Sequence, residues 1–97
     1  LQRADVFFQL GLDAEEAWVP ALLEQCRNPR IQPGKPGFVN GAWKITPLEV
    51  PDSLTRSLGN LHPRGNPHFN VDPVRGRQLV INVATGLIRV RPEKEEY

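Results

Sequence analysis

Histidine is the residue type in this sequence best suited to metal chemistry, and both histidines lie in one loop-like segment. His62 and His68 are separated by a stretch rich in proline and glycine. Neutral imidazole is a good ligand for borderline metals such as zinc. Pro63 and Pro67 restrict the backbone, so the rings can be presented with little ordering cost. Spacing alone still favours two ordinary surface histidines, because two ligands fall short of the three or four that a zinc site uses.

Asp72 is the third residue of this segment with a chemical role to consider. It precedes Pro73, an arrangement typical of a helix N-cap followed by proline at the first helical position. It also suits the second shell of a metal site, where a carboxylate orients a ligating imidazole.

Other groups of residues that could form a catalytic site are weaker candidates. The hydroxyl residues near His62 lack a G-x-S-x-G motif, and helix capping explains the acidic residues 13–16 as well as acid–base chemistry does.

The composition describes a small globular domain with an even charge balance. The chain has 97 residues, is 39% hydrophobic and carries a net charge of +1. This balance leaves no electrostatic footprint for nucleic acid or an anionic membrane. No apolar stretch has the roughly 20 residues of a transmembrane span, so we expect none in this chain. The absence of Met leads us to expect a processed product or an excised fragment. The single cysteine, Cys26, excludes an internal disulfide, and we expect it to pack in the core.

The first half of the chain predicts a strand, a helix and a long loop. Residues 6–10 are a short apolar run ending at a glycine, which indicates a buried strand. Asp13 and Glu16 have capping-box spacing, so a helix should begin there, restart near Pro20 and end at residues 28–29. Its buried face is predicted from i, i+4, i+8 spacing to be Trp18, Leu22 and Cys26.

Two long loops and one further strand fill the middle of the chain. Residues 29–41 and 51–71 are dense in proline and glycine, which is typical of loops. Residues 43–50 alternate well enough for a strand, and Pro47 favours an edge or a bulge. Long loops in so small a domain are often functional.

The last quarter of the chain fits two structures. The Asp72 signal favours a helix, whereas the β-prone residues around a turn at 84–86 favour a hairpin. Propensity alone leaves these alternatives open. Pro92 ends either element, and Glu93 to Tyr97 has the pattern of another helix start.

The histidine segment resembles a loop of the zinc- and manganese-binding solute receptors of ABC importers. The resemblance is carried by His62-Pro63-x-Gly65-Asn66-Pro67-His68-Phe69-x-x-Asp72-Pro73. Flanking stretches in the same order are also similar to that family, namely residues 4–11, Glu16-x-Trp18, Ile45 with 48–51, and 86–90 with Pro92 and Tyr97. The similarity therefore covers nearly the whole chain. One departure is Asn70, where the family often carries Trp.

The resemblance implies an α/β fold, in which residues 1–97 form a single partial domain. This domain would be part of the N-terminal lobe of a two-lobe receptor, with short parallel strands, flanking helices and two long loops. Residues 72–91 would then be helix. The family's metal ligand is the histidine after the Asn-Pro pair, here His68. We expect His62 to assist as a second ligand and Asp72 to lie in the second shell.

The implied function is capture of a divalent transition metal, zinc first and manganese as the alternative, without catalysis. The expected partner is an ABC transporter membrane permease, and the expected location is periplasmic or extracytoplasmic, associated with the cell envelope. Two other classes stay open. A small metal-dependent hydrolase would use the histidines and Asp72 as an open site. A non-catalytic interaction module is suggested only by the proline-rich loops.

Overall fold

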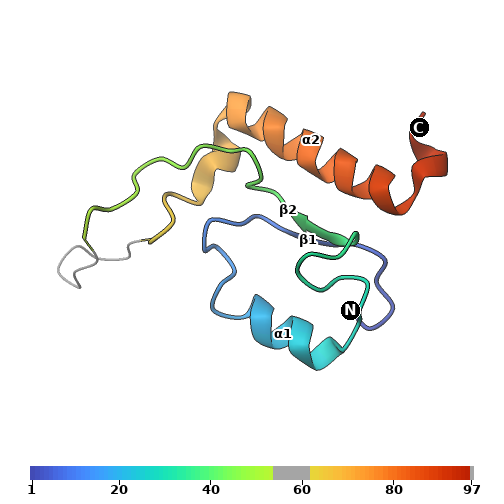
Figure 1. The fold of residues 1–97 in the computed structure, drawn as a ribbon. Coiled ribbons are helices and arrows are strands. Elements are labelled where there is room, and N and C mark those ends of the chain that lie inside the picture. The colour runs from blue at the N-terminus through green and yellow to red at the C-terminus, as the bar shows by residue number, and fades with distance from the viewer. Residues whose placement is uncertain (54–61, 97) are drawn as a thin grey trace.

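The computed structural model describes residues 1–53 and 62–96 and has a mixed α/β fold. Two short strands form a parallel sheet, and two α-helices lie on either side of it (Figure 1). The general α/β class and the parallel pairing are confirmed. The more specific prediction of a receptor lobe stays a prediction. In chain order the elements are β1 (Phe7–Gln9), α1 (Val19–Cys26), β2 (Phe38–Asn40), the 3-10 helix η2 (His68–Val71), α2 (Pro73–Val90) and the 3-10 helix η3 (Pro92–Lys94).

The sheet positions the two helices through the alternation of its side chains. Phe7 pairs with Phe38 in the parallel register, and their rings stack with centroids 6.1 Å apart. Both rings pack against α1. The next residue of β2, Val39, lies on the other face and contacts α2. Strand β1 falls where the sequence predicted a strand, but the predicted burial is wrong, because Phe8 is 41% exposed. Strand β2 falls inside the predicted loop 29–41, so that part of the loop prediction is wrong.

The main hydrophobic core lies between α1 and the sheet. It is built on Val19, Leu23 and Ile31, and Cys26 packs against this cluster as expected. The predicted buried face of the helix is wrong at its other two positions. Trp18 is 53% exposed and Leu22 is 36% exposed. The buried residues of α1 are instead Val19 and Leu23, each one position after a predicted residue.

The predicted helix start at Asp13 is wrong for two physical reasons. Leu12 and Asp13 have φ values of +51° and +67°, so the backbone there is left-handed and cannot enter a right-handed helix. Pro20 lacks an N–H and its ring excludes a helical carbonyl four residues earlier. Pro20 is instead in the first turn of α1, which confirms the predicted restart. Helix α1 ends at Cys26, with Arg27 in the left-handed conformation just before the predicted stop.

The predicted strand at residues 43–50 is also wrong. Lys44 and Glu49 have φ values of +61° and +54°, which interrupt an extended backbone. A turn closes at Ile45, whose N–H donates to the carbonyl of Ala42 at 3.0 Å. Of the predicted loop 51–71, residues 54–61 lie outside the described part, and its last residues form η2.

Helix α2 resolves the alternative for residues 72–91 in favour of a helix, and the hairpin is wrong. Asp72 is its N-cap and accepts hydrogen bonds from the backbone N–H groups of Val74 and Arg75. Close packing on β2 depends on Gly86, where an added Cβ would lie 2.2 Å from Val39 Cγ2. Buried Asn82 donates to the carbonyls of Gly41 and Trp43, at 2.7 Å each.

The helix start predicted at Glu93 to Tyr97 forms only one short turn in the structure. Residues 92–94 form the single turn η3, and Tyr97 lies outside the described residues. Within residues 1–53 and 62–96, no helix is both long enough and apolar enough to cross a membrane.

Candidate metal centre

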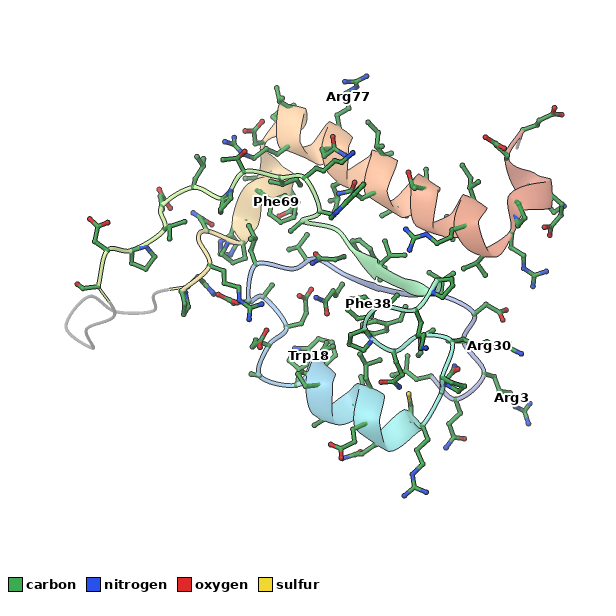
Figure 2. The ribbon with its side chains drawn as sticks, in the orientation of Figure 1. Arg3, Trp18, Arg30, Phe38, Phe69 and Arg77 are labelled. Carbon is green, nitrogen blue, oxygen red and sulfur yellow. The ribbon has the colours of Figure 1, made fainter. Side chains whose placement is uncertain are left out.

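The loop that carries the histidines is held against the segment 47–49. The N–H of Asn66 donates to the carbonyl of Leu48 at 2.8 Å. This close approach requires a glycine at position 65. Gly65 has a φ of +100°, and an added Cβ would lie 2.7 Å from Pro47 Cβ. One turn later Phe69 is buried and anchors η2 beneath the start of α2 (Figure 2). The loop is therefore fixed on both sides of His68.

The two predicted ligand histidines lie side by side. Their ring centroids are 6.3 Å apart and the rings meet edge to face at 79°. His62 is half-buried and His68 is exposed. Imidazoles that share a tetrahedral zinc ion at about 2.0–2.1 Å have ring centres roughly 5 Å apart. The observed pair is somewhat wider, and rotation about side-chain torsions can close a difference of this size.

The imidazole of His68 has a defined partner in Asn66. Asn66 Oδ1 accepts the backbone N–H of His68 at 2.9 Å and lies 3.0 Å from His68 Nδ1. The amide group of Asn66 donates in turn to a carboxylate oxygen of Glu49 at 2.6 Å. His68 is therefore the end of a short chain of polar contacts that begins at residue 49.

Asp72 makes the contacts of a helix cap. One carboxylate oxygen accepts from the N–H of Val74 at 2.8 Å and of Arg75 at 3.4 Å, and the other pairs with the Arg75 guanidinium. The bond from Val74, followed by that from the Arg75 side chain, lowers the pKa of Asp72 below its ordinary value. The capping role is confirmed, and the second-shell role stays a prediction.

Two carboxylates lie in the same surface hollow as His62, but Arg64 holds them. The hollow is lined by Asp13, Glu16, Ala17, His62, Pro63 and Arg64. Arg64 bonds Asp13 through its backbone N–H at 2.8 Å and through its Nε at 3.1 Å. Its guanidinium also lies 3.6 Å from Glu16. Among the residues that the structure describes, no three His, Cys, Asp or Glu side chains are grouped so that they could hold a metal ion.

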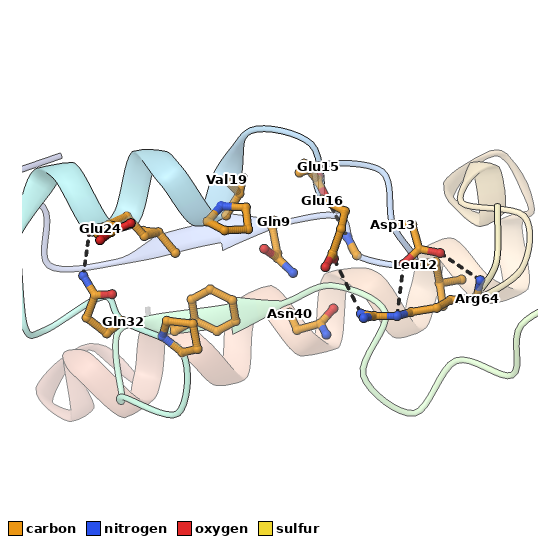
Figure 3. A pocket seen from close by; sticks show the side chains of 15 residues that line it. Gln9, Leu12, Asp13, Glu15, Glu16, Val19, Glu24, Gln32, Asn40 and Arg64 are labelled. Carbon is orange, nitrogen blue, oxygen red and sulfur yellow. Dashed lines mark hydrogen bonds and ion pairs between the residues drawn. The ribbon is translucent and has the colours of Figure 1, made fainter. Parts of the chain in front are cut away.

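A second cleft, of about 430 Å³, opens between α1 and the sheet. Figure 3 shows Glu24 and Gln32 at one end, Gln9 and Asn40 in the middle, and Glu16, Asp13 and Arg64 at the other end. Its wall includes the apolar side chains of Val19, Leu23 and Phe38. The cleft therefore shares Arg64 and its two carboxylates with the hollow at His62.

Glu49 and Asn66 are the residues that sequence reasoning missed as neighbours of the site. Asn66 had a local signal, because Asn two residues before a backbone N–H commonly accepts from it in an Asx turn. Glu49 gave none, since its contact with Asn66 spans 17 positions of the sequence. Of the predicted set, the structure brings His62 and His68 together and directs Asp72 to helix capping.

Comparison of the chain with protein-family models, curated proteins and solved structures finds no match.

Proposed function

We propose that this chain binds a divalent transition metal ion and takes part in metal capture rather than catalysis. The observation that supports this best is the histidine pair, with ring centroids 6.3 Å apart in a loop fixed by Gly65 and Phe69. Two imidazoles this close supply two nitrogen ligands with little rearrangement. His68 is the principal ligand of the proposal and His62 is the second.

The chemistry of these ligands favours zinc over manganese. Imidazole suits zinc, whereas manganese prefers carboxylate and other oxygen ligands. The carboxylates that share the surface hollow with His62, Asp13 and Glu16, are paired with Arg64. An oxygen-rich site would require these ion pairs to break, so manganese is the second choice.

The physiological role proposed is that of a receptor which delivers the metal to an ABC import permease outside the cytoplasm. This part of the proposal depends on the resemblance of the loop from His62 to Pro73, and of the flanking stretches, to zinc and manganese solute receptors. In this proposal the metal ion is bound by the two histidines, and further ligands complete its coordination.

Zinc titration of the chain by calorimetry tests the proposal. We expect one zinc ion to bind with micromolar rather than nanomolar affinity, because two imidazoles leave other positions to water. His68→Ala should weaken binding at least tenfold. Cys26→Ser is the matched control, since it removes the one thiol and should leave binding unchanged. Equal zinc affinity of the wild type and His68→Ala would overturn the proposal. Phosphoester hydrolysis by the chain that a chelator abolishes would instead support the metal-dependent hydrolase.

A further inference from the structure

The contacts of Asn66 determine which nitrogen of His68 carries hydrogen. The Glu49 carboxylate can only accept, so the group of Asn66 that meets it at 2.6 Å must be the amide nitrogen. The carbonyl oxygen of Asn66 then faces His68. Because that oxygen can only accept, the His68 Nδ1 atom 3.0 Å away must be the donor. The lone pair of the neutral ring is therefore on Nε2.

The backbone around these residues holds the three side chains in place. Asn66 is tied to the segment 47–49 through the carbonyl of Leu48. Glu49 has a φ of +54°, a left-handed conformation that non-glycine residues adopt at a cost. The same oxygen of Asn66 also accepts the backbone N–H of His68, so a single group fixes both the main chain and the ring.

We infer that Asn66 and Glu49 are positioning residues for His68, which hold its imidazole as the Nδ1–H tautomer with Nε2 free to bind a ligand. The use of Nε2 for a metal rests on the proposed function, whereas the tautomer is a property of the metal-free chain. Metal-bound histidines commonly donate their other ring N–H to a carbonyl, carboxylate or water, and this fixes ring orientation. Asp72, the residue expected in that role from the sequence, is occupied with Val74 and Arg75 instead.

Nitrogen-15 NMR of the histidine side chains tests the tautomer in the metal-free chain. The spectrum is recorded with chelator present, at a pH well above the ordinary histidine pKa of about 6.5. The wild type should show His68 with hydrogen on Nδ1. Asn66→Ala should shift the population towards Nε2–H. Asn66→Asp combined with Glu49→Gln retains an acceptor at position 66 without placing two carboxylates together, and should restore Nδ1–H. Glu24→Gln, at an exposed position outside the loop, is the control and should leave the His68 signals unchanged.

A second variant keeps the test valid if Asn66→Ala disturbs the loop. Glu49→Ala removes the group that fixes the Asn66 amide while leaving residues 66–68 intact. It should reduce the Nδ1–H population by less than Asn66→Ala does. A wild-type His68 with hydrogen on Nε2, or variants at 66 and 49 that leave its tautomer unchanged, would overturn the inference.

Zinc affinity separates this inference from the proposed function. Loss of a partner that orients a metal-bound imidazole typically weakens metal binding by about 10–100-fold, so Asn66→Ala should fall in that range and Asn66→Asp with Glu49→Gln should bind like the wild type. Absence of zinc binding by the wild type would refute the proposed function, with the tautomer result unaffected. Zinc binding that is equally tight in Asn66→Ala would refute the positioning role alone.

Discussion

Asp72 shows how one side chain can couple the start of a helix to pH. Its carboxylate accepts from the N–H groups of Val74 and Arg75 and pairs with the Arg75 side chain. All of these partners favour the charged form, so the pKa is lowered on folding. The unfolded chain then binds a proton more readily than the folded chain does. The stability from this carboxylate is therefore complete above its ordinary pKa of 3.8 and is lost as pH falls through the lowered value.

Asp72→Asn should reduce the acid sensitivity of folding. Asparagine keeps an N-cap acceptor but cannot titrate, so part of the loss of stability as the pH falls below the ordinary carboxyl pKa of 3.8 should disappear. Urea unfolding of both proteins at pH values above and below this pKa measures the effect. The exposed residue Glu24 provides a control, because Glu24→Gln should lose stability as the wild type does. An equal acid-induced loss in Asp72→Asn and the wild type would contradict this assignment.

At the level of single residues, the sequence indicated which side chains of the loop lie together, but not which residues surround them. His62 and His68 were predicted to act together, and their rings are neighbours. Local spacing was sufficient there because both residues belong to one short loop. The contacts of Asn66 with Glu49 depend on how segment 47–49 folds onto the loop, and no local pattern encodes this.

At the level of elements, α2 packs on β2 through Gly86, and Leu79 of the same helix packs over Gly41, just after the strand. The sheet residue Val39 fills the space in front of Gly86, where an added Cβ would be only 2.2 Å away. Gly76, in the same helix, has only the carbonyl oxygen of Asn70 nearby, at 3.5 Å. Substitution at Gly86 therefore tests close packing against the sheet, whereas substitution at Gly76 tests helix propensity alone.

Alanine at these two glycines should have opposite effects. Gly86→Ala should destabilise the fold by about 1–3 kcal/mol, because Val39 must move from a packed position. Gly76→Ala should stabilise it by roughly 0.5–1 kcal/mol through helix propensity and reduced unfolded-state entropy. Chemical denaturation of both variants measures the difference. If Gly86→Ala is as stable as Gly76→Ala, the close contact between α2 and β2 is wrong.

The elements that sequence reasoning found are those with strong local signals. Asp72 with Pro73 marks the start of α2, and the apolar run at residues 6–10 marks β1. Strand β2 has only three residues and is stabilised by pairing with β1, a contact between distant parts of the chain. The start of α1 was misjudged because capping-box spacing at Asp13 competes with a left-handed backbone and with Pro20.

At the level of the whole molecule, the fold is open and its core is small. The radius of gyration is 15.1 Å, whereas a compact domain of this length has about 12.5 Å. Several large apolar side chains are exposed just before α1, on α2 and on the segment after β2. They include Trp18, Trp43, Val74, Val80 and Leu87. The outer face of α2 is open to solvent, and in Figure 2 the charged side chain of Arg77 points away from the rest of the chain. Little apolar burial is available to offset the conformational entropy of folding.

This chain should therefore be of low stability. We expect thermal unfolding below the usual mesophilic range, with a Tm under about 45 °C. Circular dichroism at 222 nm, which follows α2 in particular, measures it. Saturating zinc should raise the Tm, because a ligand that binds only the folded state stabilises it. A Tm above 60 °C without metal would contradict the small core described for this chain.

The most direct test of the central claim is X-ray absorption of the chain loaded with one equivalent of zinc. Binding by His68 and His62 predicts a first shell of nitrogen and oxygen at about 2.0–2.1 Å with imidazole scattering beyond it. The imidazole contribution should diminish in His68→Ala. A sulfur neighbour at about 2.3 Å, which would indicate Cys26, or an imidazole signal unchanged in His68→Ala, would contradict the assignment of this loop as the metal site.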